Sequence, residues 1–395
     1  MTFRLAVPSI LELTILAGTV GCIQLGFLAS AAWRSRRRSA PLKDPPSVAV
    51  IVACKGVPPG LEANAAALLD QDYPGEVSWL FVVPEEGDPA CRVLSAAVAG
   101  KPRARVLASG VKPERCSGKA ADLVWALDRL PEGAELVAFA DADVRVGRDW
   151  LTAMTAPLAD HEVGVATSAT VPVPGGASFW GVLRMLWTAG GIPFFDALGM
   201  VCGQSMALRR PDIVSWGLAG VWSRAFLEDL ALTALARRLG RPVRFVFAAM
   251  PAQSGDCSAG EFWAVFNKWW MCFRVYELRL WLPCLLLIAF KVYAVGRGVW
   301  PRLHPGLLAI LWGMDALFLL AVLLWLRSLR PANFADLPGG ISGAGAAALL
   351  GAPVLPWIYA ANFLCTLGPP RIRWGGRLYH LAGPLDVRVV ADSRG

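Results

Sequence analysis

Hydrophobic residues gather in long stretches at both ends of this 395-residue chain and in short runs between them. The first stretch, residues 7–33, is long enough to cross a hydrocarbon core of ~30 Å, and no cleavage site follows it, which predicts an uncleaved anchor over residues 1–33. Three more stretches fall within a C-terminal membrane region at 281–367, namely 281–295, 306–326 and 341–367. The last two are long enough to span. The other is short and carries Lys291, which predicts a segment along the membrane interface.

Between these stretches, residues 47–280 show the alternation of an α/β domain. Residues 47–53 form a continuous apolar run rich in Val, which is typical of a strand covered on both faces. Further strands are expected at 77–83, 105–108 and 135–140, and helices at 61–70, 89–99 and 119–130. This order predicts a mostly parallel, Rossmann-like sheet with right-handed crossovers. Ligands of such sheets bind beyond the carboxyl ends of the strands.

The composition excludes an ordinary soluble protein. Hydrophobic residues make up 55% of the chain and charged residues 17%, against roughly 45–50% and ~25% in globular proteins. The same balance excludes disordered chains, coiled coils and disulfide-stapled secreted scaffolds. The nine cysteines show no metal-like spacing, which indicates a reducing compartment and no structural zinc.

Basic residues predict the topology. The net charge is +8, and arginines cluster at 34–38 and 371–377, directly after apolar stretches. Positive residues beside spans mark the cytoplasmic side, and this interpretation is favoured over a nucleic-acid surface. We therefore expect the basic linker 34–46, the catalytic domain 47–280 and the basic tail 368–395 to lie in the cytoplasm, with two C-terminal spans.

Two acidic pairs are candidates for chemistry. Asp141 and Asp143 follow directly on the strand expected at 135–140. Their oxygens suit Mg²⁺ or Mn²⁺ shared with a diphosphate, and the position after a buried strand favours this over ordinary loop acids. Glu228 and Asp229 open a helix, where acids also stabilise the helix dipole. A carboxylate at this place could take a proton from an acceptor hydroxyl.

Basic and further acidic residues complete the candidate set. Lys119 heads a helix after a loop and could hold phosphate oxygens together with the free N–H groups there. Lys268 lies in an aromatic cluster at 261–270, where it could neutralise a diphosphate leaving group, although tryptophans also mark membrane interfaces. Glu85 and Asp88 follow the second strand and could accept hydrogen bonds from a nucleotide base or ribose. Solvated loop acids are an equal alternative for these two.

The order of these residues resembles the membrane-bound family 2 and 21 glycosyltransferases, most closely the ceramide glucosyltransferases. The matching segments are CKGV at 54–57, LDQDYP at 69–74, GDPA at 87–90, GK at 118–119, DAD at 141–143, GQSM at 203–206, ED at 228–229 and WGGRLY at 374–379. The resemblance implies a GT-A fold, a UDP-sugar donor, a divalent metal (Mg²⁺ or Mn²⁺) and inversion at the anomeric carbon.

The resemblance also implies roles for single residues. Asp229, with Glu228 beside it, would be catalytic, and Asp141 and Asp143 would bind the metal. The donor-binding residues would be Lys55, Glu85, Asp88, Lys119, Asp141, Lys268, Trp269 and Arg377. Two departures from the family pattern are Lys268 and Gly375, which stand where Arg is usual. Lysine keeps the charge but not the bidentate fork, which favours single-sugar transfer over polymer synthesis.

The expected function is transfer of one glucose from UDP-glucose to a hydroxyl of ceramide. The expected location is a bacterial inner membrane, with the UDP-sugar, the lipid acceptor and the bilayer as partners and no nucleic acid. One alternative is a UDP-N-acetylhexosamine or other UDP-sugar transferase acting on a hopanoid or other bacterial lipid. Another is a catalytically silent membrane scaffold, which the altered Lys268 segment favours and the three carboxylates Asp141, Asp143 and Asp229 disfavour.

Overall fold

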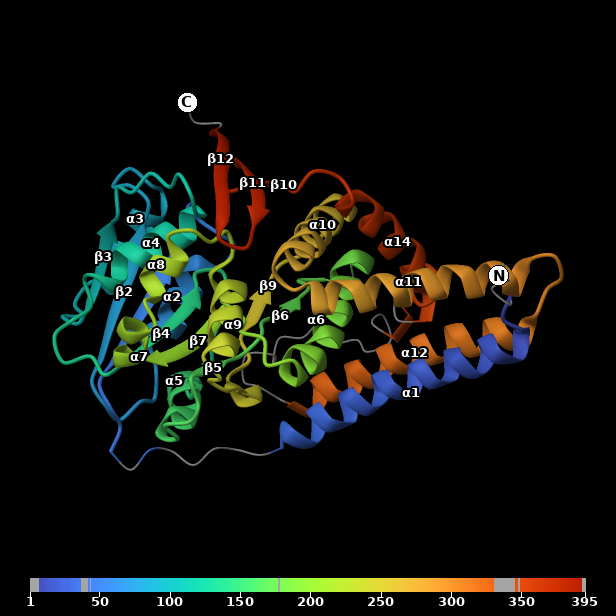
Figure 1. Cartoon of the computed structure of the whole chain (residues 1–395). Helices are drawn as coiled ribbons and strands as arrows, with labels where there is room; N and C mark the ends of the chain where they lie inside the picture. The colour runs from blue at the N-terminus through green and yellow to red at the C-terminus, as the bar shows by residue number, and fades with distance from the viewer. Residues whose placement is uncertain are drawn as a thin grey trace.

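A seven-stranded sheet forms the core of the α/β domain, which lies at the left of Figure 1. The computed structural model describes residues 7–36, 42, 44–176, 178–329, 345–346 and 349–392. The strands in spatial order are β3 (Ala104–Ala108), β2 (Val77–Val83), β1 (Val48–Ala53), β4 (Leu136–Asp141), β7 (Ser205–Arg209), β5 (Val165–Thr167) and β8 (Val243–Phe245). The first four are parallel to one another, and β7 is antiparallel to both of its neighbours. The mostly parallel α/β sheet expected from the sequence is confirmed.

Helices cover both faces of the parallel half because its strands alternate their apolar side chains between two cores. The crossover helices are α2 (Leu61–Leu69), α3 (Ala90–Val98) and α4 (Gly118–Leu127). Val50 and Val52 of β1 pack in the core that contains α2 and α3, whereas Ile51 packs in the core that contains α4. Because both faces of β1 are buried in this way, its sequence is a continuous apolar run.

Apart from the helix that Glu228 and Asp229 open, which the sequence predicts, the second half of the domain carries elements that hydrophobic periodicity did not indicate. A two-stranded sheet pairs β6 (Val171–Val173) with β9 (Ala252–Ser254), and β8 runs parallel to β5. The helices of this half are α5 (Trp150–Thr155), α7 (Arg210–Ser215), α8 (Leu218–Trp222) and α9 (Glu228–Arg238), with 3₁₀ turns at η1 (Ala156–Ala159) and η2 (Phe247–Ala249). The inserted antiparallel strand β7 brings residues 203–205 against the end of β4, where Asp141 N–H donates to the carbonyl of Gln204 at 3.2 Å.

Three helices are long and apolar enough to cross a membrane by length and composition: α1 (Ile10–Arg34), α11 (Leu278–Val299) and α12 (Pro305–Leu329). Figure 1 shows them side by side, with the start of α1 and the α11–α12 connection at the same end, far from the sheet. Leu13 of α1 accordingly packs with Val295 of α11 and Leu308 of α12. Gly21 allows α1 to approach α12 closely, since a Cβ there would overlap the side chain of Met314.

The C-terminal region differs from the expected segments in two places. The segment expected at 281–295 is part of the 22-residue helix α11, so its length was underestimated. Lys291 forms an ion pair with Asp315 of α12, so both charges face a neighbouring helix. Residues 341–344, 347 and 348 of the stretch expected at 341–367 lie outside the described residues. The described helix in that stretch, α14 (Leu355–Thr366), has 12 residues.

A layer of aromatic-rich helices packs against the three long helices, and two of its members also contact the sheet domain. It consists of α6 (Phe179–Ala197), α10 (Ala259–Tyr276) and α14. Trp187 of α6 packs edge-on against Phe266 of α10, with ring centroids 4.0 Å apart, and also contacts Tyr359 of α14 at 5.7 Å. Tyr276 of α10 reaches back to the sheet domain, where its hydroxyl accepts the N–H of Phe226 at 2.7 Å.

The basic tail folds into an antiparallel sheet of β10 (Arg371–Trp374), β11 (Arg377–Gly383) and β12 (Asp386–Asp392). This sheet packs against the α/β domain (Figure 1). Val389 N–H donates to the carbonyl of Glu114 at 3.0 Å, and the rings of Tyr379 and Phe226 lie 4.9 Å apart. The tail and the domain therefore lie on the same side of the three long helices.

Tyr276→Phe tests the link between α10 and the segment that precedes α9. The change removes the acceptor of a buried N–H, and we expect the free energy of unfolding to fall by about 1–3 kcal/mol. The measurement is the thermal unfolding midpoint in detergent. Tyr293→Phe is the matched control because Tyr293 is 41% exposed, and we expect a change within about 0.5 kcal/mol there. Equal midpoints for the two variants would contradict the prediction.

Candidate active site

Polar side chains from three separate segments meet in one cavity at the carboxyl edge of the sheet. The cavity has a volume of about 140 Å³. Asp141 ends β4, Lys119 lies in the first turn of α4, and Glu228 and Asp229 open α9. Ser117 caps the start of α4, because its side chain accepts the N–H of Ala120 at 3.1 Å. This cap fixes Lys119 in the first turn of the helix, beside the cavity.

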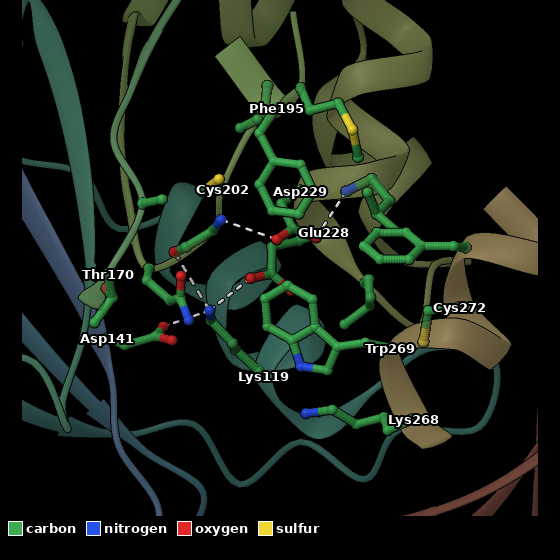
Figure 2. A pocket seen from close by; sticks show the side chains of 18 of the residues that line it. Lys119, Asp141, Thr170, Phe195, Cys202, Glu228, Asp229, Lys268, Trp269 and Cys272 are labelled. Carbon is green, nitrogen blue, oxygen red and sulfur yellow. Dashed lines mark hydrogen bonds and ion pairs between the residues drawn. The ribbon is translucent and has the colours of Figure 1, made fainter. Parts of the chain in front are cut away.

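Lys119 holds two of these carboxylates together. Its ammonium forms ion pairs with Asp141 and, at 2.6 Å, with Glu228 (Figure 2). Burial alone would lower the pKa of Lys119, but the two carboxylates outweigh burial and raise it above its ordinary value. Lys119 thus neutralises two acids that flank the cavity, and its contact with a donor phosphate stays a prediction.

Asp229 is held by backbone rather than by a cation. Gly203 N–H donates to Asp229 Oδ2 at 2.9 Å, and Leu230 N–H donates to Oδ1 at 2.7 Å. Burial, and next the nearby charge of Glu228, raise the pKa of Asp229 to about 6. A carboxylate with this pKa can accept a proton near neutral pH.

Lys268 and Trp269 of α10 form another wall of the same cavity. The Lys268 ammonium lies 3.3 Å from the ring centroid of Trp374, which belongs to the tail sheet. Burial lowers the pKa of Lys268. Trp374 also lines the cavity, so the tail contributes a side chain to the site.

Asp143 lies next to the cavity and is oriented by a polar chain. Gln253 of β9 donates its side-chain N–H to Asp143, and Arg184 of α6 donates to Gln253 Oε1 at 2.6 Å. No group of three or more His, Cys, Asp or Glu side chains suited to a metal occurs among the described residues. Two carboxylates one residue apart nevertheless fit Mg²⁺ or Mn²⁺, since these ions complete their coordination with water and substrate phosphates.

The remaining predicted residues do not line this cavity. Lys55 follows β1 and donates to the carbonyl of Gly375 in the tail. Asp88, which is 7% exposed, accepts the N–H groups of Gly56 and Ala90 on one oxygen, both at 2.9 Å. Asp88 therefore holds the loops after β1 and β2 together, a structural role that the sequence did not indicate. Glu85 is exposed on the same loop.

Arg377 is 9% exposed and lies beneath the start of α4. A Cβ at Gly118 would lie 3.1 Å from its Nη1 atom. The positive charge of Arg377 also opposes the rise that burial causes in the pKa of Asp122, which reaches about 6. Lys55, Asp88 and Arg377 thus gather beside the cavity, over the ends of β1 and β2.

Three further residues complete the site. The Gly203 carbonyl accepts a hydrogen bond from Lys119, and the Gly203 N–H donates one to Asp229. Gln253 of β9 contacts Asp143, and Trp374 of the tail contacts Lys268. Two of them lie in segments that the sequence did single out, GQSM and WGGRLY. Gln253 has no such signal, because its role depends on the pairing of β9 with β6.

The fold and the site define a transferase-like α/β domain joined to membrane-length helices. The model of glycosyl transferase family 21 matches residues 13–384, and the chain belongs to this family. It is therefore a glycosyltransferase, and its domain has the expected mostly parallel α/β sheet. No curated protein matches the chain.

Two solved structures are similar to this chain at low identity. Mannosyltransferase PcManGT from Pyrobaculum calidifontis, in complex with GDP-Man and Mn²⁺, is 17% identical with a TM-score of 0.49, covering 90% of this chain and 97% of that one. Glucosyl-3-phosphoglycerate synthase from Mycobacterium tuberculosis, in complex with Mg²⁺ and UDP, is 16% identical with a TM-score of 0.34, covering 55% and 75%.

Gly203→Ala tests whether the close approach of Gly203, just before β7, to α9 fixes the positions of the Glu228 and Asp229 carboxylates. A Cβ at Gly203 would overlap Glu228 Oε1 and lie 3.3 Å from Asp229 Cβ. We expect sugar transfer to fall at least about tenfold, corresponding to ~1.4 kcal/mol in the barrier, and the protein to remain folded. The measurement is turnover in isolated membranes beside the thermal midpoint. Gly220→Ala is the control, since nothing lies within 4 Å of its Cβ position, and an equal loss in both variants would contradict the prediction.

Proposed function

We propose that this protein transfers glucose from UDP-glucose to the primary hydroxyl of ceramide with inversion at the anomeric carbon. The observation that carries the proposal is Asp229, a carboxylate with a pKa of about 6 on the wall of the acid-lined cavity. Family 21 membership and the resemblance to ceramide glucosyltransferases support the choice of donor and acceptor.

The donor diphosphate would lie at the carboxyl edge of the sheet. Asp141 and Asp143 would hold the divalent metal, which when bound supplies positive charge to the diphosphate leaving group. Lys268, half-buried at the cavity wall, would add a cation on the opposite side. Lys119 would neutralise the negative charges of Asp141 and Glu228 while the site is without substrate, because two unpaired carboxylates in one cavity repel each other.

Asp229 would act as the general base. Its free lone pairs accept the proton of the lipid hydroxyl. The oxygen of that hydroxyl then attacks the anomeric carbon as the bond from that carbon to the diphosphate oxygen breaks. UDP leaves with that electron pair, and the attack from the opposite face inverts the centre. The N–H groups of Gly203 and Leu230 keep the carboxylate aimed at the cavity.

The acceptor would come from the membrane. The cavity is bounded by α6 and α10, the helices that contact both the sheet domain and the three long helices. With α1, α11 and α12 as spans, the domain and the tail would share the cytoplasmic face of a bacterial inner membrane, as the basic clusters at 34–38 and 371–377 favour.

The function is tested by label transfer in membranes that contain the protein. We expect radiolabelled UDP-glucose to yield labelled glucosylceramide, and Asp229→Asn to reduce the rate by at least about a hundredfold while retaining UDP binding. Asp128→Asn is the matched control, because Asp128 is exposed at the end of α4.

Other labelled products would point elsewhere. Label from UDP-N-acetylglucosamine in a hopanoid or other non-sphingoid lipid would overturn the choice of donor and acceptor. UDP binding without transfer to any lipid would overturn the catalytic proposal and indicate a membrane scaffold.

The pH dependence of transfer tests Asp229 separately. The base acts when ionised, and its pKa is raised to about 6, so kcat/KM should fall about tenfold per unit as pH drops below 6. An ordinary aspartate, with a pKa of ~3.9, would keep the rate constant down to about pH 5. The measurement is the initial rate at low acceptor concentration from pH 5 to 8, and a flat profile would rule out Asp229 as a base with this pKa.

A further inference from the structure

A second cavity of about 380 Å³ lies between the three long helices and the aromatic-rich layer. Residues of α1, α11 and α12 line one side of it, and residues of α6, α10 and α14 line the other. The lining side chains are mostly apolar. At ~30 Å³ for each water-sized group, this volume holds about a dozen methylene groups.

The second cavity adjoins the active-site cavity. Four residues line both of them: Thr188, Phe195, Trp269 and Phe273. The rings of Phe195 and Trp269 lie nearly parallel, with centroids 6.3 Å apart, and Figure 2 shows both beside Asp229 and Glu228. One layer of side chains therefore separates the proposed base from an apolar space among membrane-length helices.

Polar groups also face this apolar space. The Tyr359 hydroxyl is buried and has no hydrogen-bond partner among the described residues, and Tyr359 lines the cavity. The Lys291–Asp315 ion pair and Gln24 line it as well. A buried hydroxyl without a partner costs free energy unless a ligand supplies one, which favours an occupant that carries a hydrogen-bonding group as well as a hydrocarbon chain.

We propose that the second cavity binds a hydrocarbon chain of the acceptor lipid, and that the Tyr359 hydroxyl hydrogen-bonds an amide or hydroxyl group of that lipid. This inference rests on the proposed function, because it takes the acceptor to be a membrane lipid. The chain lies between α1, α11 and α12 on one side and α6, α10 and α14 on the other, and the reactive hydroxyl extends past Phe195 and Trp269 toward Asp229. The cavity then selects acceptors by chain and by polar linkage, separately from the donor site.

Two glycines provide a matched test of the chain site. Gly191 of α6 lines the cavity with nothing within 4 Å of its Cβ position, so Gly191→Leu adds bulk inside the cavity. Gly313 of α12 is exposed and also has nothing within 4 Å, so Gly313→Leu adds the same bulk outside it. For long-chain ceramide we expect Gly191→Leu to raise KM at least about tenfold with the KM for UDP-glucose unchanged, and Gly313→Leu to match wild type.

Tyr359→Phe tests the hydrogen bond with the smallest change in shape. We expect the KM for ceramide to rise about fivefold with kcat nearly unchanged, because the hydroxyl would contribute to binding and not to the chemical step. Unchanged KM values in both Gly191→Leu and Tyr359→Phe would overturn the proposal.

Photolabelling separates this inference from the proposed function. A long-chain ceramide with a diazirine in its acyl chain should label peptides of α6, α10 or α14 in wild type and equally in Asp229→Asn, in which transfer is expected to be at least about a hundredfold slower. The label should be lost in Gly191→Leu and retained in Gly313→Leu. Labelling that Gly191→Leu leaves intact, or that excess phosphatidylethanolamine removes as well as unlabelled ceramide does, would overturn the acceptor-chain site even if glucosylceramide is made.

Discussion

The ion pairs of Lys119 tie the site to the fold. One ammonium joins the end of β4 to the start of α9 through Asp141 and Glu228, and it extends from the capped start of α4. All three side chains line the cavity, so the loss of one partner would leave a charge that is only partly solvated and has lost its compensation. This contact therefore links the end of β4 to the start of α9, where Asp229 is oriented by the N–H groups of Gly203 and Leu230.

The aromatic-rich layer of α6, α10 and α14 connects this electrostatic centre to the membrane-length helices. On the side facing the sheet it supplies Lys268 and Trp269 to the active-site cavity. On the other side it lines the larger apolar cavity with Trp187, Trp270 and Tyr359. Aromatic side chains suit this position because they present a large apolar body and, in Trp and Tyr, one polar group. One layer can thus separate a charged reaction site from an apolar lipid site.

The tail shows how a distant segment completes the site. Trp374 stacks on Lys268, and Lys55 donates to Gly375, so the tail contacts both α10 and the loop after β1. Both glycines at this turn have positive φ, 56° for Gly375 and 80° for Gly376. A residue with a Cβ would be strained at these φ values. Glycine adopts them without strain, which allows the tight turn that places Trp374 at the cavity. An Arg at position 375, which is usual in the family that this tail resembles, would be strained at this positive φ.

The sequence by itself determined the parallel half of the sheet, Asp141 at a strand end, Lys119 and Asp229 at helix starts, and the long apolar helices α1 and α12, because these depend on local periodicity and on the ends of local elements. Expected strand and helix bounds in that half lie within three residues of those observed. The tertiary structure alone decided the antiparallel insertion of β7, the contact of Gln253 with Asp143, the pairing of Lys291 with Asp315, and the use of Lys119 and Asp88 as structural partners. Each of these joins residues more than 20 positions apart, and such contacts form only when whole elements have packed.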